Sequence, residues 1–325
     1  MTVSARSFAK INLGLRIGPP RSDGFHQLLT VYQTIALYDL IRVTVTRGSG
    51  IEIRSADSRV PTDDSNTCFR IVDRAMAVLG AQGRVLIEIE KRLPVQGGLG
   101  GASANAVATL LALERALKKS LPAAERFRVA AEVGSDLPLF LVGGTTLGTG
   151  RGEQVFPLPD LPALPCVVVT PEVGVSTPKA FAAWDRLHST GDAKLTALHP
   201  SDRMDELGRD LSAWLSMPYS GAPSGSLKSG GRAGNPLLWL VRAGIKNDFE
   251  EVVFPEYPEL REGKRALERV GAEYASLSGS GSTLYGLFAS REAAAGGAVK
   301  LRKQGWAAQA TALLTRRQYW RRMLG

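Results

Sequence analysis

The sequence predicts an α+β protein of two domains. Its 325 residues correspond to about two domains of roughly 100–200 residues each. The first half begins with strand patterns and continues with a strand, a glycine-rich loop and a helix, an order typical of α+β domains. Four prolines within residues 151–165 then interrupt both helix and strand patterns. We therefore predict one domain over residues 1–155 and a second over residues 156–325.

Residues 11–17 predict the first strand, because apolar side chains alternate with others there. The apolar face carries Ile11, Leu13, Leu15 and Ile17. The opposite face carries Lys10, Asn12 and Gly14. Successive side chains of a strand point to opposite faces. We therefore expect Lys10 and Asn12 to lie side by side, away from the apolar layer.

The rest of the first half follows from the same patterns. Further strands are expected over residues 31–35, 41–46 and 84–90. Asp64 or Ser65 can cap a helix. The apolar face of that helix carries Cys68, Ile71, Ala75, Val78 and Leu79. A second helix is expected over residues 103–119, directly after the glycine-rich loop.

The second half opens with a strand of the buried type over residues 166–170. The least ordered piece is expected over residues 219–236, where 11 of 18 residues are Gly, Ser or Pro. Such a stretch has little apolar surface to bury, so it predicts a long loop or an insertion.

The net charge of +9 is the unusual feature of the composition. It indicates an anionic partner, either nucleic acid or phosphorylated small molecules. Seven basic residues and no acidic residue lie from residue 300 onward, which leaves +2 for the preceding 299 residues. Trp306, Tyr319 and Trp320 interleave with these cations and would suit stacking on bases. Residues 307–314, however, have the apolar pattern of a strand or helix in the protein core. We therefore expect small-molecule partners and no nucleic acid.

The few cysteines and histidines argue against a disulfide-stabilised or metal-binding protein. Cys68 and Cys166 are too few for a disulfide scaffold or a four-cysteine zinc site. Three scattered histidines do not predict a metal site. No apolar stretch reaches the roughly 18 residues of a membrane span, and the first residues lack a secretory pattern. We expect a cytoplasmic protein without a membrane partner.

The glycine-rich loop before the second helix predicts a phosphate site. Glycines let the backbone turn sharply, and the unpaired N–H groups at a helix start favour an anion. Ser103 adds a hydroxyl for a phosphate oxygen or for Mg²⁺. The loop is neither a Walker A sequence nor a Rossmann fingerprint, and a plain flexible turn is the alternative. The candidate residues are Pro94, Val95, Gln96, Gly97, Gly98, Leu99, Gly100, Gly101, Ala102, Ser103 and Ala104.

Two further segments carry candidate chemistry. Residues 276–285 hold Gly279 and Gly281 among hydroxyl residues, and they predict either a brace for the first loop or a simple turn between strands. Asp136 follows the glycine that ends a predicted helix. It either caps the next helix or accepts a proton from an attacking hydroxyl. Lys10 is either a solvated strand lysine or part of the same site.

Taken in order, these segments resemble the GHMP kinase superfamily from Phe8 to Phe288. The resemblance rests on AKINL at residues 9–13, RSDGFH at 21–26, PVQGGLGGASANA at 94–106, GSDLP at 134–138 and NDFE at 247–250. Within the superfamily, the DGFH element makes the chain most similar to kinases that act on a cytidine diphosphate derivative of methylerythritol. These enzymes serve the non-mevalonate route to isoprenoids. The resemblance implies two domains with the active site in the cleft between them.

The resemblance also implies ATP-dependent phosphorylation of the C2 hydroxyl of the methylerythritol moiety. Asp136 would be the general base, and Lys10 would hold its carboxylate ionised. The glycine-rich loop would cradle the phosphates of ATP, with Mg²⁺ bridging them. Asn66 is a candidate for the adenine pocket. Asn12 would reach a substrate hydroxyl or the diphosphate.

The same resemblance predicts how the cytosine is bound. Phe25 and Phe181 would stack on the base, with Thr177 in the matching second-domain element, and the His26 region would supply hydrogen bonds. Core packing is the alternative for both phenylalanines. The chain departs from the family pattern at Gln96, Ala102 and Ala104. Another GHMP kinase, for homoserine or mevalonate, remains the alternative activity, and a monomer or weak homodimer is expected.

Overall fold

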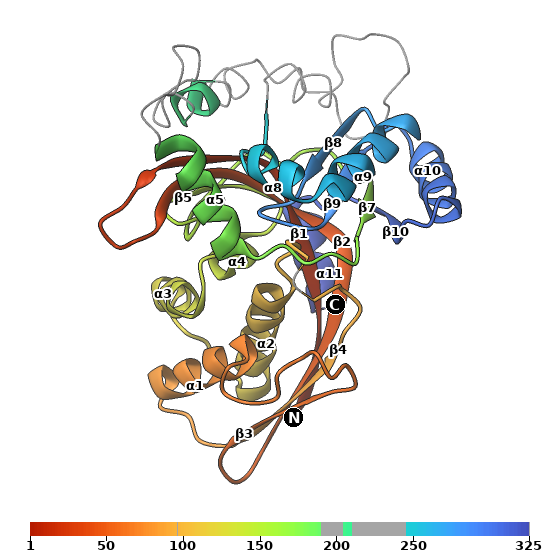
Figure 1. Cartoon of the computed structure of the whole chain (residues 1–325). Helices are drawn as coiled ribbons and strands as arrows, with labels where there is room; N and C mark the ends of the chain where they lie inside the picture. The colour runs from red at the N-terminus through yellow and green to blue at the C-terminus, as the bar shows by residue number, and fades with distance from the viewer. Residues whose placement is uncertain (96, 190–203, 210–244, 325) are drawn as a thin grey trace.

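The chain folds around two β-sheets, each covered by helices (Figure 1). This computed structural model describes residues 1–95, 97–189, 204–209 and 245–324. Gln96 and the insertion predicted over residues 219–236 lie outside the described residues. Helices and strands are mixed along the chain, which confirms the predicted α+β class.

In the described part of the chain, the first sheet has six strands. Five follow the order β3-β4-β2-β5-β6, and β1 pairs with β2. Their bounds are β1 Thr2–Pro20, β2 His26–Thr46, β3 Ile51–Ser55, β4 Arg84–Glu90, β5 Thr145–Thr149 and β6 Gln154–Pro157. The strand predicted over residues 84–90 therefore agrees with β4 at both ends.

Strands β1 and β2 form one long antiparallel hairpin. The segments 31–35 and 41–46 both lie within β2, so the prediction of two separate strands is wrong. Residues 38–40, between these segments, also pair with β1, for example Tyr38 with Phe8, so β2 continues across an irregularity in the ladder. The register of β1 shifts after Phe8, Asn12 and Ile17. Each shift disturbs the simple alternation of faces, and Lys10 and Asn12 are both buried.

Four labelled helices follow the early strands of the first sheet. They are α1 Thr67–Leu79, α2 Gly101–Leu117, α3 Ala123–Val133 and α4 Leu137–Val142. Figure 1 shows α1, α2 and α3 on the same side of the long strands. Asn66 caps α1, because its Oδ1 accepts a hydrogen bond from the Cys68 amide at 2.8 Å. The predicted caps, Asp64 and Ser65, are therefore wrong, and Val78 is exposed rather than on the buried face.

The second sheet has the strand order β10-β7-β9-β8. Its strands are β7 Pro165–Val169, β8 Tyr274–Leu277, β9 Leu284–Leu287 and β10 Ala308–Ala312. The helices of this half include α5 Thr177–Ser189, α8 Glu250–Glu256, α9 Pro258–Arg269 and α10 Arg291–Lys303. Strand β7 is buried at every residue, as the apolar run predicted.

A buried carboxylate joins the second half of the chain to β1. Asp248 precedes α8, and its Oδ1 accepts a hydrogen bond from Nη1 of Arg16 at 3.0 Å. Its Oδ2 accepts one from the Ile17 amide at 2.9 Å. Both ionised side chains are almost completely buried. The carboxylate thus fixes β1 against the segment that leads into α8.

The basic C-terminal segment folds back onto the first half. In α11, Arg316–Met323, the Tyr319 hydroxyl donates to the Phe140 carbonyl at 2.7 Å and the Trp320 indole donates to the Val142 carbonyl at 3.0 Å. Trp306 packs against the core of the second half. These aromatic side chains are engaged within the fold, and the absence of a nucleic-acid partner stays a prediction. The domain division after residue 155 stays a prediction.

We expect Asp248→Asn to lower the free energy of unfolding by about 3 kcal/mol, because it leaves the buried Arg16 charge with only the more exposed carboxylate of Glu206, 3.2 Å from its Nη2. Urea unfolding followed by circular dichroism measures this change. Arg128→Gln is the control, since it breaks exposed pairs on α3 and should cost less than about 1 kcal/mol. Equal losses in both variants would contradict the role given to Asp248.

Candidate active site

Lys10 lies at the centre of the candidate site, on β1. Its side chain is about 95% buried, so the alternative of a solvated strand lysine is wrong. Its Nζ donates to Oδ1 of Asn12 at 2.7 Å and lies 3.4 Å from Oδ2 of Asp136. A buried ammonium group requires such partners, because removing the charge from water is costly. The expected neighbours Lys10 and Asn12 are thus side by side.

Asp136 stands at the start of α4, but its side chain makes no capping hydrogen bond. Instead, Oδ1 accepts a hydrogen bond from the Tyr32 hydroxyl at 3.2 Å. Burial, and the Asp136 charge beside it, raise the pKa of Tyr32 well above its usual range. The hydroxyl therefore stays protonated and acts as a donor. Lys10 holds one carboxylate oxygen and Tyr32 the other, and the carboxylate remains one-third exposed to a cavity.

The glycine-rich loop packs directly onto Lys10. The Lys10 amide donates to the Leu99 carbonyl at 2.9 Å. Gly100 has a φ of +68°, and a Cβ there would lie 3.0 Å from Cγ of Lys10. Any larger residue would be strained and would push against the lysine. These contacts fix the position of the loop relative to Lys10, and α2 begins immediately after the loop.

The second glycine segment, residues 278–283 between β8 and β9, braces this loop. The Ser278 hydroxyl donates to the Gly98 carbonyl at 3.0 Å, and the Thr283 amide donates to the Gly97 carbonyl at 3.1 Å. Gly98 has a φ of +76°, and a Cβ there would lie 2.3 Å from the Ser278 carbonyl oxygen. The segment is a turn between strands, and it also contacts the first loop, so both sequence interpretations of it apply.

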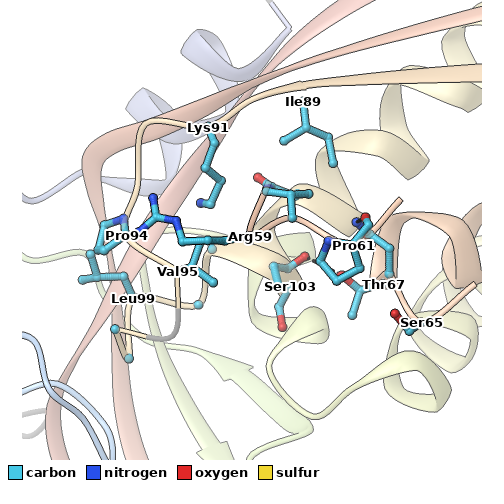
Figure 2. Close-up of a pocket in the computed structure, with 18 residues that line it drawn as sticks. Arg59, Pro61, Ser65, Thr67, Ile89, Lys91, Pro94, Val95, Leu99 and Ser103 are labelled. Atoms are coloured by element: carbon cyan, nitrogen blue, oxygen red, sulfur yellow. Dashed lines mark hydrogen bonds between the residues drawn. The ribbon is translucent and has the colours of Figure 1, made fainter. Parts of the chain in front are cut away.

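A first cavity of about 380 Å³ lies over the loop and the start of α2 (Figure 2). Val60, Pro61 and Ile89 give it an apolar side. Figure 2 shows Lys91 and Ile89 along one edge, with Ser103 across the cavity from them. Its predicted lining residues are Asn66, Pro94, Val95, Gly97, Gly98, Leu99, Gly100, Gly101, Ala102 and Ser103. Ala104 is buried in α2 and does not line it.

Asn66 lines this cavity while it caps α1. Its Oδ1 accepts from the Cys68 amide and its Nδ2 donates to the Pro61 carbonyl at 2.6 Å. Asn66 therefore has a structural role at the start of α1. An adenine contact stays a prediction.

The sequence interpretation missed a buried ion pair at the entrance to the loop. Nζ of Lys91 lies 2.5 Å from Oδ2 of Asp39, whose side chain is fully buried. Asp39 also accepts hydrogen bonds from the Arg92 and Leu93 amides, both at 2.7 Å, and from Nδ2 of Asn105 at 3.0 Å. One carboxylate thus ties β2, the loop and α2 together, and it places an ammonium group at the cavity wall.

A second cavity, of about 310 Å³, lies on the other side of the loop. Gly98 and Gly100 line both cavities, so the two share the loop as a wall. The predicted catalytic and substrate residues all line the second cavity: Lys10, Asn12, Phe25, His26, Asp136, Thr177 and Phe181. The structure thus gathers residues from widely separated parts of the chain around the Lys10–Asp136 pair.

The aromatic groups of this cavity are arranged differently from a simple sandwich. Phe25 is half exposed, so the alternative of core packing is wrong for this residue. Phe181 stacks on His26, with ring centroids 5.2 Å apart and planes 5° from parallel. Nε2 of His26 lies 3.0 Å from Oδ1 of Asp185. Asn12 uses its amide within the protein, since Nδ2 donates to the Thr30 hydroxyl at 2.8 Å.

The described ranges show neither a cluster of metal-ligating side chains nor a membrane-spanning helix. They contain no group of three or more His, Cys, Asp or Glu side chains that is placed to hold a metal ion. No described helix is both long and apolar enough to cross a membrane. Both described cysteines are buried and unpaired, and burial raises the pKa of Cys68 to about 12.

Comparison with known protein families identifies both halves of the chain. The GHMP kinases N terminal domain matches residues 66–144, and the GHMP kinases C terminal domain matches residues 236–305. The first match contains the glycine-rich loop and Asp136, and the second contains the bracing segment. The fold and the site therefore define a GHMP kinase.

Individual relatives narrow this class. The chain is 38% identical to 4-diphosphocytidyl-2-C-methyl-D-erythritol kinase of Solibacter usitatus (strain Ellin6076), over 89% of this chain and 82% of the relative. It is 36% identical to the enzyme of the same name from Moorella thermoacetica, over 89% and 90%. A crystal structure of 4-(cytidine 5'-diphospho)-2C-methyl-D-erythritol kinase superimposes with a TM-score of 0.70 and 28% identity, covering 95% of this chain and 98% of that one. The chain belongs to the 4-diphosphocytidyl-2-C-methyl-D-erythritol kinase family.

We expect Tyr32→Phe to lower turnover by roughly tenfold, the equivalent of about 1.4 kcal/mol, because Asp136 loses one of its two orienting partners. The KM values for both substrates should change little. Steady-state kinetics between about pH 6 and pH 9 check this, since the Tyr32 hydroxyl stays protonated there.

The matched control for that experiment is Tyr257→Phe, which removes a hydroxyl outside both cavities. It should leave turnover unchanged. Normal turnover in Tyr32→Phe, or a rise in the KM for ATP without a fall in turnover, would argue against an orienting role.

Proposed function

We propose that the protein transfers the γ-phosphoryl group of ATP to the C2 hydroxyl of 4-diphosphocytidyl-2-C-methyl-D-erythritol, a step of the non-mevalonate route to isoprenoids. The observation that carries this proposal is the Lys10–Asp136 pair where two cavities meet at one glycine-rich loop. Family membership supports this choice of substrate, because the relatives are named as kinases of that compound. Each substrate would occupy one cavity, so that the reacting atoms meet beside the loop.

Asp136 acts as the general base in this proposal. Its carboxylate accepts the proton of the C2 hydroxyl while the oxygen forms a bond to the γ-phosphorus. The bond between the γ-phosphorus and the bridging oxygen breaks, and ADP leaves with that electron pair. Lys10 pairs with the carboxylate before the transfer and offsets negative charge near the reacting oxygens as it develops. Tyr32 holds the carboxylate in one orientation.

ATP occupies the first cavity in this proposal. The adenine would lie against the apolar side formed by Val60, Pro61 and Ile89. The phosphates would lie over the loop, where backbone N–H groups and the start of α2 favour negative charge. Mg²⁺ would enter with the nucleotide as part of the substrate, and Ser103 offers a hydroxyl to it. Lys91 adds a positive charge at the wall.

The cytidine end of the acceptor occupies the aromatic part of the second cavity. The half-exposed ring of Phe25 offers a stacking surface. A base that stacks on Phe181 must replace the contact that this ring makes with His26. Hydrogen bonds from the His26 region would then select cytosine over other bases. The C2 hydroxyl would lie near Asp136 at the far end.

A cytoplasmic location and a monomer or weak homodimer also remain part of the proposal. The buried, unpaired cysteines are compatible with a reducing compartment.

We expect Asp136→Asn to reduce turnover by about a hundredfold or more, while the KM for ATP stays within roughly twofold of wild type, because ATP binds in the other cavity. A coupled ADP-release assay measures both constants. Asp73→Asn, an exposed position on α1, is the control and should behave like wild type. Near-normal turnover of Asp136→Asn would defeat the general-base assignment.

The substrate is tested with the wild-type chain. ADP release should require the cytidine diphosphate substrate and should be absent with homoserine or mevalonate. Release with either of those two at a comparable rate would overturn the proposed substrate while leaving the kinase class intact.

A further inference from the structure

Arg151 is a charged residue of the second cavity that the catalytic scheme leaves without a role. Among the described lining residues of this cavity, Lys10 and Arg151 are the lysine and arginine side chains. Lys10 is committed to Asn12 and Asp136. The Arg151 side chain is about one-third exposed, and its guanidinium makes no hydrogen bond to another described residue. Its donors are therefore available to a ligand in the cavity.

Arg151 lies near the aromatic end of the second cavity. The guanidinium carbon lies 4.8 Å from the centre of the Phe25 ring, at the aromatic end. The next residue, Gly152, accepts a hydrogen bond from the Tyr32 hydroxyl at 3.5 Å, and the same hydroxyl contacts Asp136. The Arg151 guanidinium thus lies beside the Phe25 ring, and Asp136 lines the same cavity.

The turn that carries Arg151 is held firmly in place. It connects β5 and β6 and has glycines with φ of +71° and +98° on either side of the arginine. The Gly150 carbonyl accepts from the Leu28 amide at 2.7 Å, and the Arg151 amide donates to Glu153 at 2.5 Å. The Glu153 carboxylate lies 3.8 Å from Nε of Arg151. This distance is beyond a direct hydrogen bond, so the carboxylate orients the arginine loosely and leaves the terminal NH₂ groups accessible.

We propose that Arg151 binds the diphosphate group of the cytidine substrate. This proposal rests on the proposed function, because it assumes that the second cavity holds a cytidine diphosphate derivative. In such a molecule the diphosphate lies between the base and the reacting alcohol, and Arg151 contacts Phe25 in the cavity that Asp136 also lines. A planar guanidinium matches phosphate oxygens with two parallel hydrogen bonds. It also offsets the repulsion between the diphosphate and the Asp136 carboxylate.

The contact with Phe25 gives Arg151 a second function in the same proposal. A guanidinium over one face of an aromatic ring is attracted to it and holds it in position. The other face of Phe25 then remains for the cytosine. One arginine would thereby couple base stacking to diphosphate binding.

Binding of CDP and of cytidine to wild type and to Arg151→Gln tests the proposal. The two ligands share the base and differ in the diphosphate. We expect the Kd for CDP to rise by roughly tenfold or more in Arg151→Gln and the Kd for cytidine to stay within about threefold. Arg42→Gln, which removes an exposed arginine from β2 outside the cavities, should leave both constants unchanged. Calorimetry measures them, and circular dichroism checks that each variant is folded.

The outcomes separate this proposal from the proposed function. Equal weakening of CDP and cytidine would show that Arg151 acts only through Phe25, and unchanged CDP binding would show that it has no role; either result overturns the diphosphate assignment alone. A wild-type chain that binds neither ligand would overturn the proposed function and this assignment together. Arg151→Lys should retain part of the CDP affinity, because the charge remains while the paired donors are lost.

Discussion

The buried ammonium group of Lys10 constrains most of the site around it. A lysine that is almost fully removed from water is stable only with an opposite charge and hydrogen-bond acceptors nearby. Asp136 and Asn12 supply these partners. Leu99 and Gly100 close over the backbone and the aliphatic part of the same lysine. The proposed base and the phosphate loop therefore have fixed positions relative to each other, because both are set against one side chain.

Strand β1 extends this constraint to the second half of the chain. Phe8, Ile11 and Ile17 of β1 each belong to a different buried cluster, and the cluster of Ile17 includes the second-sheet helices. Asn247 adds hydrogen bonds from its Nδ2 to the Leu277 and Gly279 carbonyls, at 2.9 and 2.7 Å. The bracing segment is thereby tied to the region that contacts β1. Two cavities can face one loop because a single strand organises both halves.

The net charge gave little guide to function, and the structure explains why. Much of the surplus lies in the C-terminal segment, where Arg316 donates to the Thr145 carbonyl at 2.9 Å and Tyr319 is buried. Among the described residues, few cationic side chains line the two cavities, and two of them, Lys10 and Lys91, are each paired with a carboxylate. Backbone N–H groups at a helix start can hold phosphate without adding to the net charge. A phosphate-binding site therefore leaves little trace in a charge count.

The sequence by itself determined the features that depend on neighbouring residues: the glycine-rich loop before a helix, the position of Asp136 at a helix start and the α+β class. These follow from local spacing and from what glycine and proline allow. The tertiary structure alone decided that Tyr32 meets Asp136 and that Asp39 holds Lys91. The register and bulges of a long hairpin determine which side chains face each other across it. Contacts between residues a hundred positions apart in the chain depend on that register, and no local pattern specifies it.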